Sequence, residues 1–145
     1  MHSALLEDIG REGDITSKVL IPKSSLSKAT IVVKEKAVIC GTEFAKQAFK
    51  KLDKSVKIRA LKKDGELANK GDKIITISGK TQNILTAERT ALNFLGLMSG
   101  VASKARKFSY IADPYGSKIY STRKTIPGIR KLEKYALTIG GAYVN

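Results

Sequence analysis

The sequence predicts an α+β first half followed by one parallel βαβ unit. Segments rich in β-branched residues alternate with segments of helical spacing in the first half of the 145-residue chain. A long apolar stripe then occupies residues 81–112. At the end, a strand, a loop, a helix and the start of another strand follow in that order, which is typical of a parallel unit.

The first 41 residues predict a short helix and then strands. Helical spacing begins near Ser3 and ends at Gly10, the turn at 13–14 redirects the chain, and Pro22 keeps the helix from resuming. Residues 29–41, ATIVVKEKAVICG, are rich in β-branched side chains and predict one or two strands.

A helix and a small antiparallel sheet are predicted next. In TEFAKQAFKKL, residues 42–52, the apolar side chains fall on one face and the lysines on the other. Residues 56–79 alternate apolar and polar side chains around two turns, at 64–65 and at 70–72. The predicted apolar face of the helix consists of Phe44, Ala45, Ala48, Phe49 and Leu52.

A largely buried helix should follow, with Thr81 or Asn83 as its N-cap. We expect Gly100 to end or kink this helix and a second helix to run to Ala112. The predicted buried stripe consists of Ile84, Ala91, Leu95 and Met98, and Leu85, Leu92 and Leu97 broaden it.

The last 28 residues predict the parallel unit: a strand at 118–120, a loop at 121–128, a helix at 129–141 and the start of a strand at 142–145. A parallel sheet needs cover on both faces, and a closed β/α barrel takes at least about 200 residues. We therefore expect the chain to be part of a larger structure. The predicted inward positions of the helix are Ile129, Leu132, Ala136 and Ile139.

Composition narrows the function classes without choosing among them. There are 27 Lys and Arg against 13 Asp and Glu, so the net charge of +14 favours anionic partners such as nucleic acid, anionic lipid or a small acidic substrate. The single Cys40 excludes an intrachain disulfide, and with the single His2 it excludes a Cys/His zinc cluster. No secretory core or run long enough to span a bilayer is present, so we expect a cytoplasmic protein without a membrane partner.

The loop TRKT, residues 122–125, is the strongest candidate site. Loops at the carboxyl ends of parallel strands collect ligands in α/β structures. Arg123 offers a planar fork for a carboxylate or phosphate, Lys124 adds a point charge, and Thr122 and Thr125 offer hydroxyl donors. The alternative is that both cations are solvated loop charges.

Arg89 is the second candidate. It lies in the predicted buried helix beside Glu88 and four residues before Asn93, where an unpaired charge would be costly. Two other interpretations stay open: the stem packs while the charged head reaches water, or the guanidinium pairs with a local carboxylate. Phosphate-binding glycine loops and a GxSxG nucleophile motif are absent from the sequence.

Four motifs in order and spacing resemble the quinolinate phosphoribosyltransferases, also called nicotinate-nucleotide pyrophosphorylases (carboxylating). These motifs are EDIGREGDITS, AVICG, ILTAERTALNFLGLMSGVAS and STRKTIPGIRKLEKYAL with the following Gly-Gly. The resemblance implies an α+β N-terminal sandwich of hammerhead type over residues 1–84. Residues 85–145 would then be connecting helices and the first βα unit at the start of an incomplete α/β barrel.

The resemblance also implies an activity. Members of the family transfer the phosphoribosyl group of phosphoribosyl pyrophosphate to quinolinate with decarboxylation, and yield nicotinate mononucleotide, pyrophosphate and CO₂ for NAD biosynthesis. They do so with Mg²⁺, whose ligands are expected in the C-terminal part that the family carries beyond this chain. Thr122, Arg123 and Lys124 match the family loop that contacts carboxylates and phosphates.

Arg89 matches the family arginine that reaches into the neighbour's site across a head-to-tail dimer, so a homodimer or higher homo-oligomer with shared sites is expected. Asn93, Thr125 and Arg130 are possible supporting residues, and no catalytic or metal-binding residue is assigned in this chain. Ser121 stands where the family usually has Asp.

The sequence departs from the family pattern at two further places. Gly96 stands where a Gln is common, and the chain stops after GGAYVN where the family continues with His-Arg. We therefore expect the 145 residues alone to be inactive. One alternative is a paralogue of the molybdenum-transport-associated type that acts on or binds another anionic ligand. Another is a basic nucleic-acid-binding module, but aromatic residues are only 6% and the lysines are spread along the chain, so no nucleic-acid partner is expected.

Overall fold

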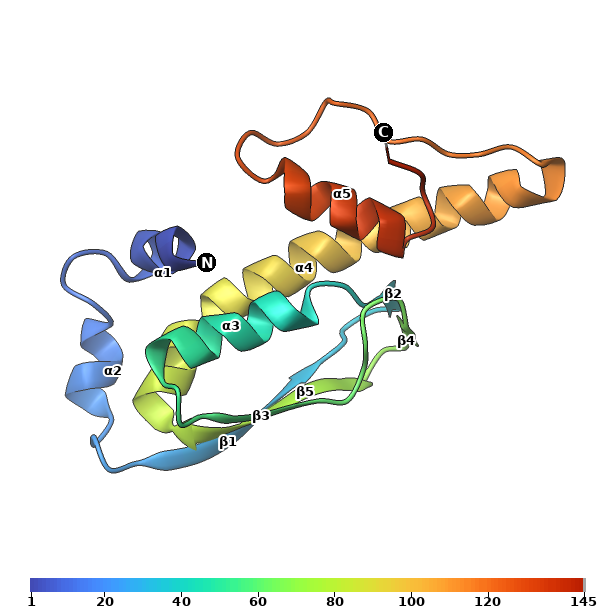
Figure 1. The fold of residues 1–145 in the computed structure, drawn as a ribbon. Coiled ribbons are helices and arrows are strands. Elements are labelled where there is room, and N and C mark those ends of the chain that lie inside the picture. Colours follow the sequence, from blue (N-terminus) through green and yellow to red (C-terminus); the bar gives the residue numbers. More distant parts are fainter. Residues whose placement is uncertain (145) are drawn as a thin grey trace.

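The structure is a computed structural model, and it describes residues 1–144. Figure 1 shows α3 and the first half of α4 over one face of a small sheet, with α5 beside the second half of α4. The helices and strands, in chain order, are α1 (His2–Ile9), α2 (Ile15–Leu20), β1 (Leu26–Val32), β2 (Ala37–Val38), α3 (Thr42–Leu52), β3 (Lys57–Ala60), β4 (Leu67–Ala68), β5 (Lys73–Lys80), α4 (Thr81–Ala112), the 3₁₀ turn η1 (Asp113–Tyr115) and α5 (Arg130–Ile139).

The main sheet has the order β1-β5-β3, and both pairings are antiparallel. Ile77 of β5 pairs with Ala29 on one side and Ile58 on the other, so one row of apolar side chains crosses the sheet on its inner face. This confirms the predicted antiparallel sheet. β4 is not part of it, because Ala68 pairs with Ala37 of β2 in a separate two-stranded ladder.

Two apolar clusters form the core. The first lies between the sheet, α3 and the first half of α4, and it includes Phe49, Ile75, Ile77 and Ile84. The second lies between β2, the second half of α4 and α5. On α4 the predicted stripe of Ile84, Ala91, Leu95 and Met98 is buried, but Leu85, Leu92 and Leu97, which were expected to broaden it, are exposed, so the buried face is narrower than predicted. On α3, Ala45, Ala48 and Phe49 are buried while Phe44 and Leu52 are partly exposed. The second cluster consists of Val38, Cys40, Met98, Ala102 and Ala136.

Helix α4 is one helix of 32 residues, so the predicted break at Gly100 is wrong. Packing against both clusters outweighs a cost of about 1 kcal/mol for each helical glycine. The predicted N-cap is wrong as well. Lys80 is the N-cap, Thr81 shares a hydrogen bond with Ser27, and Asn83 donates to the Asp53 carboxylate at 3.1 Å.

Helix α2 was not expected, because Gly13 and Pro22 flank only a short segment. The Asp14 carboxylate accepts a hydrogen bond from the Ser17 backbone N–H at 2.9 Å and caps this helix. The same carboxylate accepts from the Thr86 hydroxyl on α4 at 2.9 Å. These hydrogen bonds, those with Ser17 first, lower the pKa of Asp14, so it stays ionised at neutral pH.

The helix of the predicted parallel unit is present as α5, but among the described residues the predicted strands at 118–120 and 142–145 are reduced to a single bridge. Tyr120 and Tyr143 form one parallel bridge, and the Ser121 and Tyr143 backbone N–H groups each donate across it at 2.8 Å. On α5, Ala136 is buried while Leu132 and Ile139 pack on the second cluster, and Ile129 precedes the helix and is partly exposed. Asn145, the last residue of the predicted strand, lies outside the described residues. The domain boundary at residue 84 stays a prediction.

Alanine substitutions at two glycines, Gly140 and Gly96, should change stability in opposite directions. A Cβ on Gly140, at an ordinary helical φ of −75°, would collide with the Ala102 carbonyl oxygen and the Ala105 side chain, so Gly140→Ala should lower the free energy of unfolding by about 2 kcal/mol. A Cβ on Gly96 would meet no atom within 4 Å. Gly96→Ala should therefore raise the free energy of unfolding by about 1 kcal/mol. Urea denaturation measures both, and a destabilised Gly96→Ala would contradict the open surroundings of Gly96.

Candidate functional site

The loop at residues 121–129 lies between the bridge residue Tyr120 and α5, where the sequence placed it. The Arg130 Nε–H donates to the Thr125 hydroxyl at 2.9 Å, and its Nη2–H to the Arg123 carbonyl at 3.5 Å. The Glu133 carboxylate accepts from the Ile126 backbone N–H at 3.0 Å. The first turn of α5 is thus hydrogen-bonded to the loop at three points. The supporting role of Thr125 and Arg130 toward a ligand stays a prediction.

The cationic heads of the loop are exposed to solvent. The Arg123 and Lys124 side chains are exposed, and within residues 1–144 no ion pair or hydrogen bond engages the Arg123 guanidinium or the Lys124 ammonium. The Thr122 hydroxyl accepts from the Lys124 backbone N–H at 3.2 Å. A small cavity of about 300 Å³ lies against the loop, and Ser121, Thr122, Lys124 and Thr125 line it together with Glu133 of α5, while Arg123 does not line it. The unpaired cations and the hydroxyls can receive an anion.

Ser121 accepts a hydrogen bond from the Lys134 ammonium of α5 at 3.2 Å. The residue before the TRKT loop therefore contacts α5 through its hydroxyl.

Arg89 projects from α4 toward α1. Its Nη1–H donates to the Asp8 carboxylate at 2.9 Å, and its side chain is 74% exposed while that of Asp8 is 19% exposed. The expectation of a buried position is wrong, because this side of α4 is uncovered. The guanidinium pairs with a carboxylate, but Asp8 is 81 residues away on α1 and is not the local partner that the sequence left open. An ion pair this exposed contributes about 0–1 kcal/mol, so the guanidinium can exchange partners.

Arg89 and the exposed Asn93 border a second, larger cavity of about 560 Å³ between α1, α4 and the start of α5. The acidic side chains of Glu7 and Asp8 line the same cavity, and Ile129 at the end of the loop closes one side. Within one chain the two predicted groups therefore line different cavities. Arg89 and Asn93 lie on one, and the TRKT loop lies on the other.

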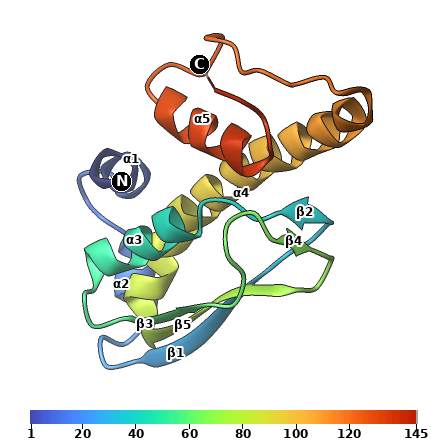
Figure 2. The same cartoon turned by 45° about the vertical axis from the view of Figure 1, so that its right-hand side comes forward.

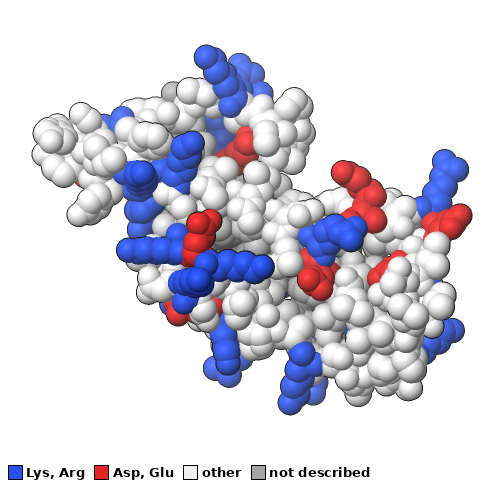
Figure 3. Space-filling view, turned by 180° about the vertical axis from the view of Figure 1, so that it is seen from behind, with Lys and Arg blue, Asp and Glu red and all other residues white. Residues whose placement is uncertain are grey.

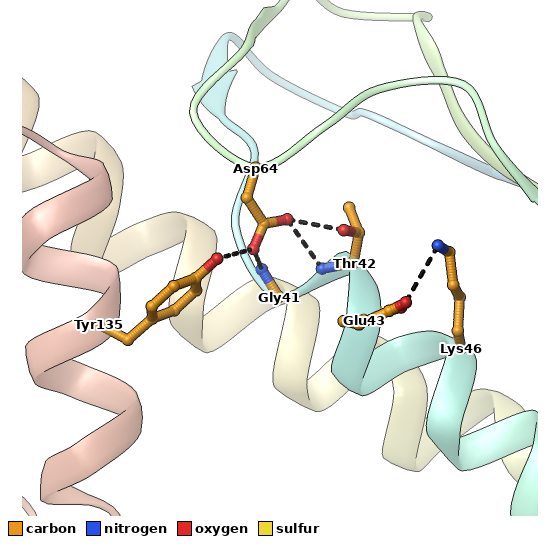
Figure 4. A network of polar contacts seen from close by, with 6 residues as sticks. All are labelled: Gly41, Thr42, Glu43, Lys46, Asp64 and Tyr135. Atoms are coloured by element: carbon orange, nitrogen blue, oxygen red, sulfur yellow. Dashed lines mark hydrogen bonds and ion pairs between the residues drawn. The ribbon is translucent and has the colours of Figure 1, made fainter.

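Sequence reasoning missed a polar network around Asp64, in the turn between β3 and β4 (Figure 4). One carboxylate oxygen accepts from the Thr42 backbone N–H at 3.1 Å and the Thr42 hydroxyl at 2.7 Å. The other accepts from the Gly41 backbone N–H at 2.9 Å and the Tyr135 hydroxyl of α5 at 3.0 Å. Gly41, the N-cap of α3, has no side chain to cap the helix, so the sequence did contain a signal that the cap comes from elsewhere.

The electrostatics of this network favour an ionised Asp64. Burial raises the pKa of its carboxyl, but the hydrogen bonds from Gly41, Thr42 and Tyr135 outweigh it, and the pKa is lowered overall. Burial and the neighbouring Asp64 charge raise the pKa of Tyr135 to about 12 and that of the fully buried Cys40 to about 12. The Cys40 thiol is therefore protonated at neutral pH and is a core residue, not a nucleophile.

Charge is distributed over the surface in separate groups. On the face shown in Figure 3, Lys and Arg side chains project from several places, and acidic side chains lie among them. In residues 1–144, no three His, Cys, Asp or Glu side chains lie together as a metal site. In the same residues, no helix is long and apolar enough to cross a membrane.

Comparison with known proteins decides the family. The model of the quinolinate phosphoribosyl transferase N-terminal domain matches residues 14–99, more than half of the chain, and the model of the C-terminal domain matches residues 101–145. The chain belongs to the quinolinate phosphoribosyltransferase family. The two family models meet inside α4, which this quinolinate phosphoribosyltransferase chain carries as one continuous helix.

Relatives and solved structures agree with this assignment. A probable nicotinate-nucleotide pyrophosphorylase (carboxylating) of Bacillus subtilis is 40% identical over 99% of this chain and 49% of its own length. The mitochondrial quinolinate phosphoribosyltransferase (decarboxylating) 2a of Nicotiana tabacum is 40% identical over 97% of this chain and 40% of its own length. The nicotinate-nucleotide pyrophosphorylase structure from Francisella tularensis is 35% identical, with a TM-score of 0.93 over 99% of this chain and 50% of that one.

The chain thus spans about half the length of these relatives. The near-complete overlap with the Francisella structure confirms the predicted fold class, an N-terminal α+β domain followed by the start of an incomplete barrel.

Proposed function

We propose that this chain supplies the N-terminal domain and the first barrel unit of an enzyme that transfers a phosphoribosyl group to quinolinate. The products would be nicotinate mononucleotide, pyrophosphate and CO₂, in NAD biosynthesis. The observation that carries this proposal is the TRKT loop, whose unpaired cations and hydroxyls form an anion-binding surface held by α5. Membership of the family and relatives named for this reaction support it.

The loop explains how a doubly acidic pyridine would be held. The guanidinium of Arg123 matches the planar geometry of one carboxylate, and Lys124 offsets the charge of the other. The hydroxyl of Thr122 donates a further hydrogen bond. With both carboxylates fixed, the ring nitrogen is oriented toward the anomeric carbon of the sugar, where the new bond forms as the bond to pyrophosphate breaks.

Arg89 is proposed to act on the site of a neighbouring subunit. It lies on the rim of a different cavity from the loop, and its head is exposed and held only by a weak surface ion pair. A head-to-tail homodimer, or a higher oligomer built from it, would bring Arg89 and Asn93 of one chain to the TRKT loop of the next. Quinolinate and phosphoribosyl pyrophosphate are then the small-molecule partners, and no nucleic acid is required.

The remaining parts of the reaction are not assigned to these residues. Among residues 1–144 no group of acidic side chains fits a Mg²⁺ site. We place the ligands of Mg²⁺ in the C-terminal part that the family has and this chain does not include. We propose that the 145 residues alone are inactive. We also propose that the complete protein, meaning this chain together with the C-terminal part found in its relatives, acts in the cytoplasm. Turnover by the 145 residues alone would contradict the first statement.

Ligand selectivity tests the proposed function. The complete protein should bind quinolinate at least about tenfold more tightly than nicotinate, because one additional charge-assisted contact is worth roughly 1.5–3 kcal/mol. Titration calorimetry with both acids at one ionic strength measures the ratio, and benzoate serves as the control for a single carboxylate. Equal binding or a nicotinate preference would reject the two-carboxylate site and favour the paralogue with another anionic ligand.

A further inference from the structure

The helix that holds the TRKT loop is itself tied to the N-terminal domain. Arg130, Glu133 and Lys134 of α5 contact the loop at Thr125, Ile126 and Ser121. The next residue, Tyr135, points toward Asp64 and donates its hydroxyl to the carboxylate at 3.0 Å, as Figure 4 shows. The contacts of α5 with the loop and its contact with Asp64 of the N-terminal domain thus lie within six residues of one helix, 130–135.

The Asp64 end of this contact is fixed in place. Its carboxylate accepts three further hydrogen bonds from Gly41 and Thr42 at the start of α3, whose buried face is part of the first core cluster. The next residue of the same turn, Gly65, also lies near α5. A Cβ added at Gly65 would be 3.9 Å from the Ile139 side chain. A tyrosine side chain has few rotatable bonds, so a hydrogen bond at its tip restricts the helix that carries it.

The far end of α5 is fixed independently. The Arg106 guanidinium of α4 donates to the carbonyl of Ile139 at 3.1 Å and to that of Gly140 at 3.2 Å. Ala136 is fully buried in the second core cluster. These contacts hold the C-terminal half of α5. The loop depends on the N-terminal half, where Leu132 packs on the second core cluster and Tyr135 adds the polar contact with Asp64.

We propose that Tyr135 and Asp64 form a positioning pair that sets the orientation of α5 and thereby the placement of the TRKT loop against its anionic ligand. The identity of that ligand rests on the proposed function, whereas the positioning of the loop does not. Displacement of reacting groups by about 1 Å is enough to reduce binding and turnover strongly. Neither residue touches the ligand in this proposal, so both act through the loop.

The test compares Tyr135→Phe with Tyr115→Phe in the complete protein. Both changes remove one phenolic hydroxyl, but Tyr115 is 83% exposed and its hydroxyl makes no hydrogen bond among the described residues. Hydrogen exchange of the peptide 121–129 reports the loop directly, because the backbone N–H groups of Ser121, Lys124, Thr125, Ile126 and Ile129 are all hydrogen-bonded. We expect exchange in this peptide to accelerate several-fold in Tyr135→Phe and not in Tyr115→Phe.

The second measurement is the quinolinate Kd. Loss of one hydrogen bond that orders the loop should weaken binding about fivefold in Tyr135→Phe, and the ratio of quinolinate to nicotinate affinity should fall with it. If Tyr135→Phe lowers only the melting temperature and leaves exchange and Kd at wild-type values, the pair serves stability alone and the positioning role is wrong. If the wild-type protein does not bind quinolinate, the proposed function fails, and loop exchange still decides the positioning role.

Discussion

Replacing Arg123 by alanine in the complete protein should weaken quinolinate binding by about 3 kcal/mol, more than a hundredfold in Kd. The reason is that the guanidinium offers two parallel N–H donors to one carboxylate, and charge-assisted pairs of this kind are about twice as strong as neutral hydrogen bonds. In the unliganded chain these donors have no ion-pair partner among residues 1–144, so the substitution breaks no internal contact of the guanidinium.

The matched control is Arg59→Ala. Arg59 lies on the exposed outer face of β3, and its loss changes the net charge by the same single unit. Titration calorimetry at two ionic strengths separates the local contact from the general attraction of a basic protein for anions. Equal losses in both variants would mean that net charge, not the loop, binds the ligand. Arg123→Lys should recover only part of the affinity, because an ammonium cannot bind in a bidentate manner.

Replacing Asp64 by alanine should lower the free energy of unfolding by about 3 kcal/mol. The change removes the acceptor for four donors at once, among them the two backbone N–H groups at the start of α3, which has no other side-chain cap. Asp113→Ala is the control, since Asp113 is exposed and its carboxylate accepts no hydrogen bond among the described residues. It should change stability by no more than about 0.5 kcal/mol.

The loss in Asp64→Ala should depend on pH. The folded-state pKa of Asp64 lies below its ordinary value, so its contribution is fully present above the unfolded-state pKa of about 3.9 and is lost as the pH falls through the folded-state pKa. Urea denaturation should therefore show the full difference between wild type and variant at pH 7, and a shrinking difference below about pH 4. A difference that is constant from pH 7 to pH 3 would mean that the ionised carboxylate is not the stabilising form.

Periodicity predicted those parts of the fold that local pattern determines. The centres of the predicted stripes on α3 and on the first half of α4 are buried, because their apolar spacing is regular over several turns. Apolar residues at the sides of these stripes, such as Leu52, Leu85 and Leu92, are half-buried or exposed. Continuation of α4 past Gly100 was not predictable from local propensity. It depends on contacts with residues far away in the chain, such as the Ser99 and Ser103 hydroxyls that accept from the backbone N–H groups of Cys40 and Val38 in the segment of β2.

The candidate site was predictable where it follows from chain order. The order strand, loop and helix predicted that Arg123 and Lys124 follow a strand end. In the structure they follow the bridge residue Tyr120 and precede α5. The exposure of Arg89 was not predictable, because the partner of its guanidinium, Asp8, is 81 residues away. Asp64 escaped notice for the same reason, since Tyr135 is 71 residues further along and a turn aspartate has many local uses.

The unbroken course of α4 limits how this molecule can move. At about 1.5 Å per residue the helix is close to 48 Å long, and the border between the two family models, at residues 99–101, falls on intact helical backbone. A hinge there would have to break helical hydrogen bonds and separate Met98 from the second core cluster. Rotation at this border is therefore disfavoured, and exposed loops such as residues 121–129 are the parts that can close over a bound ligand while the helix stays intact.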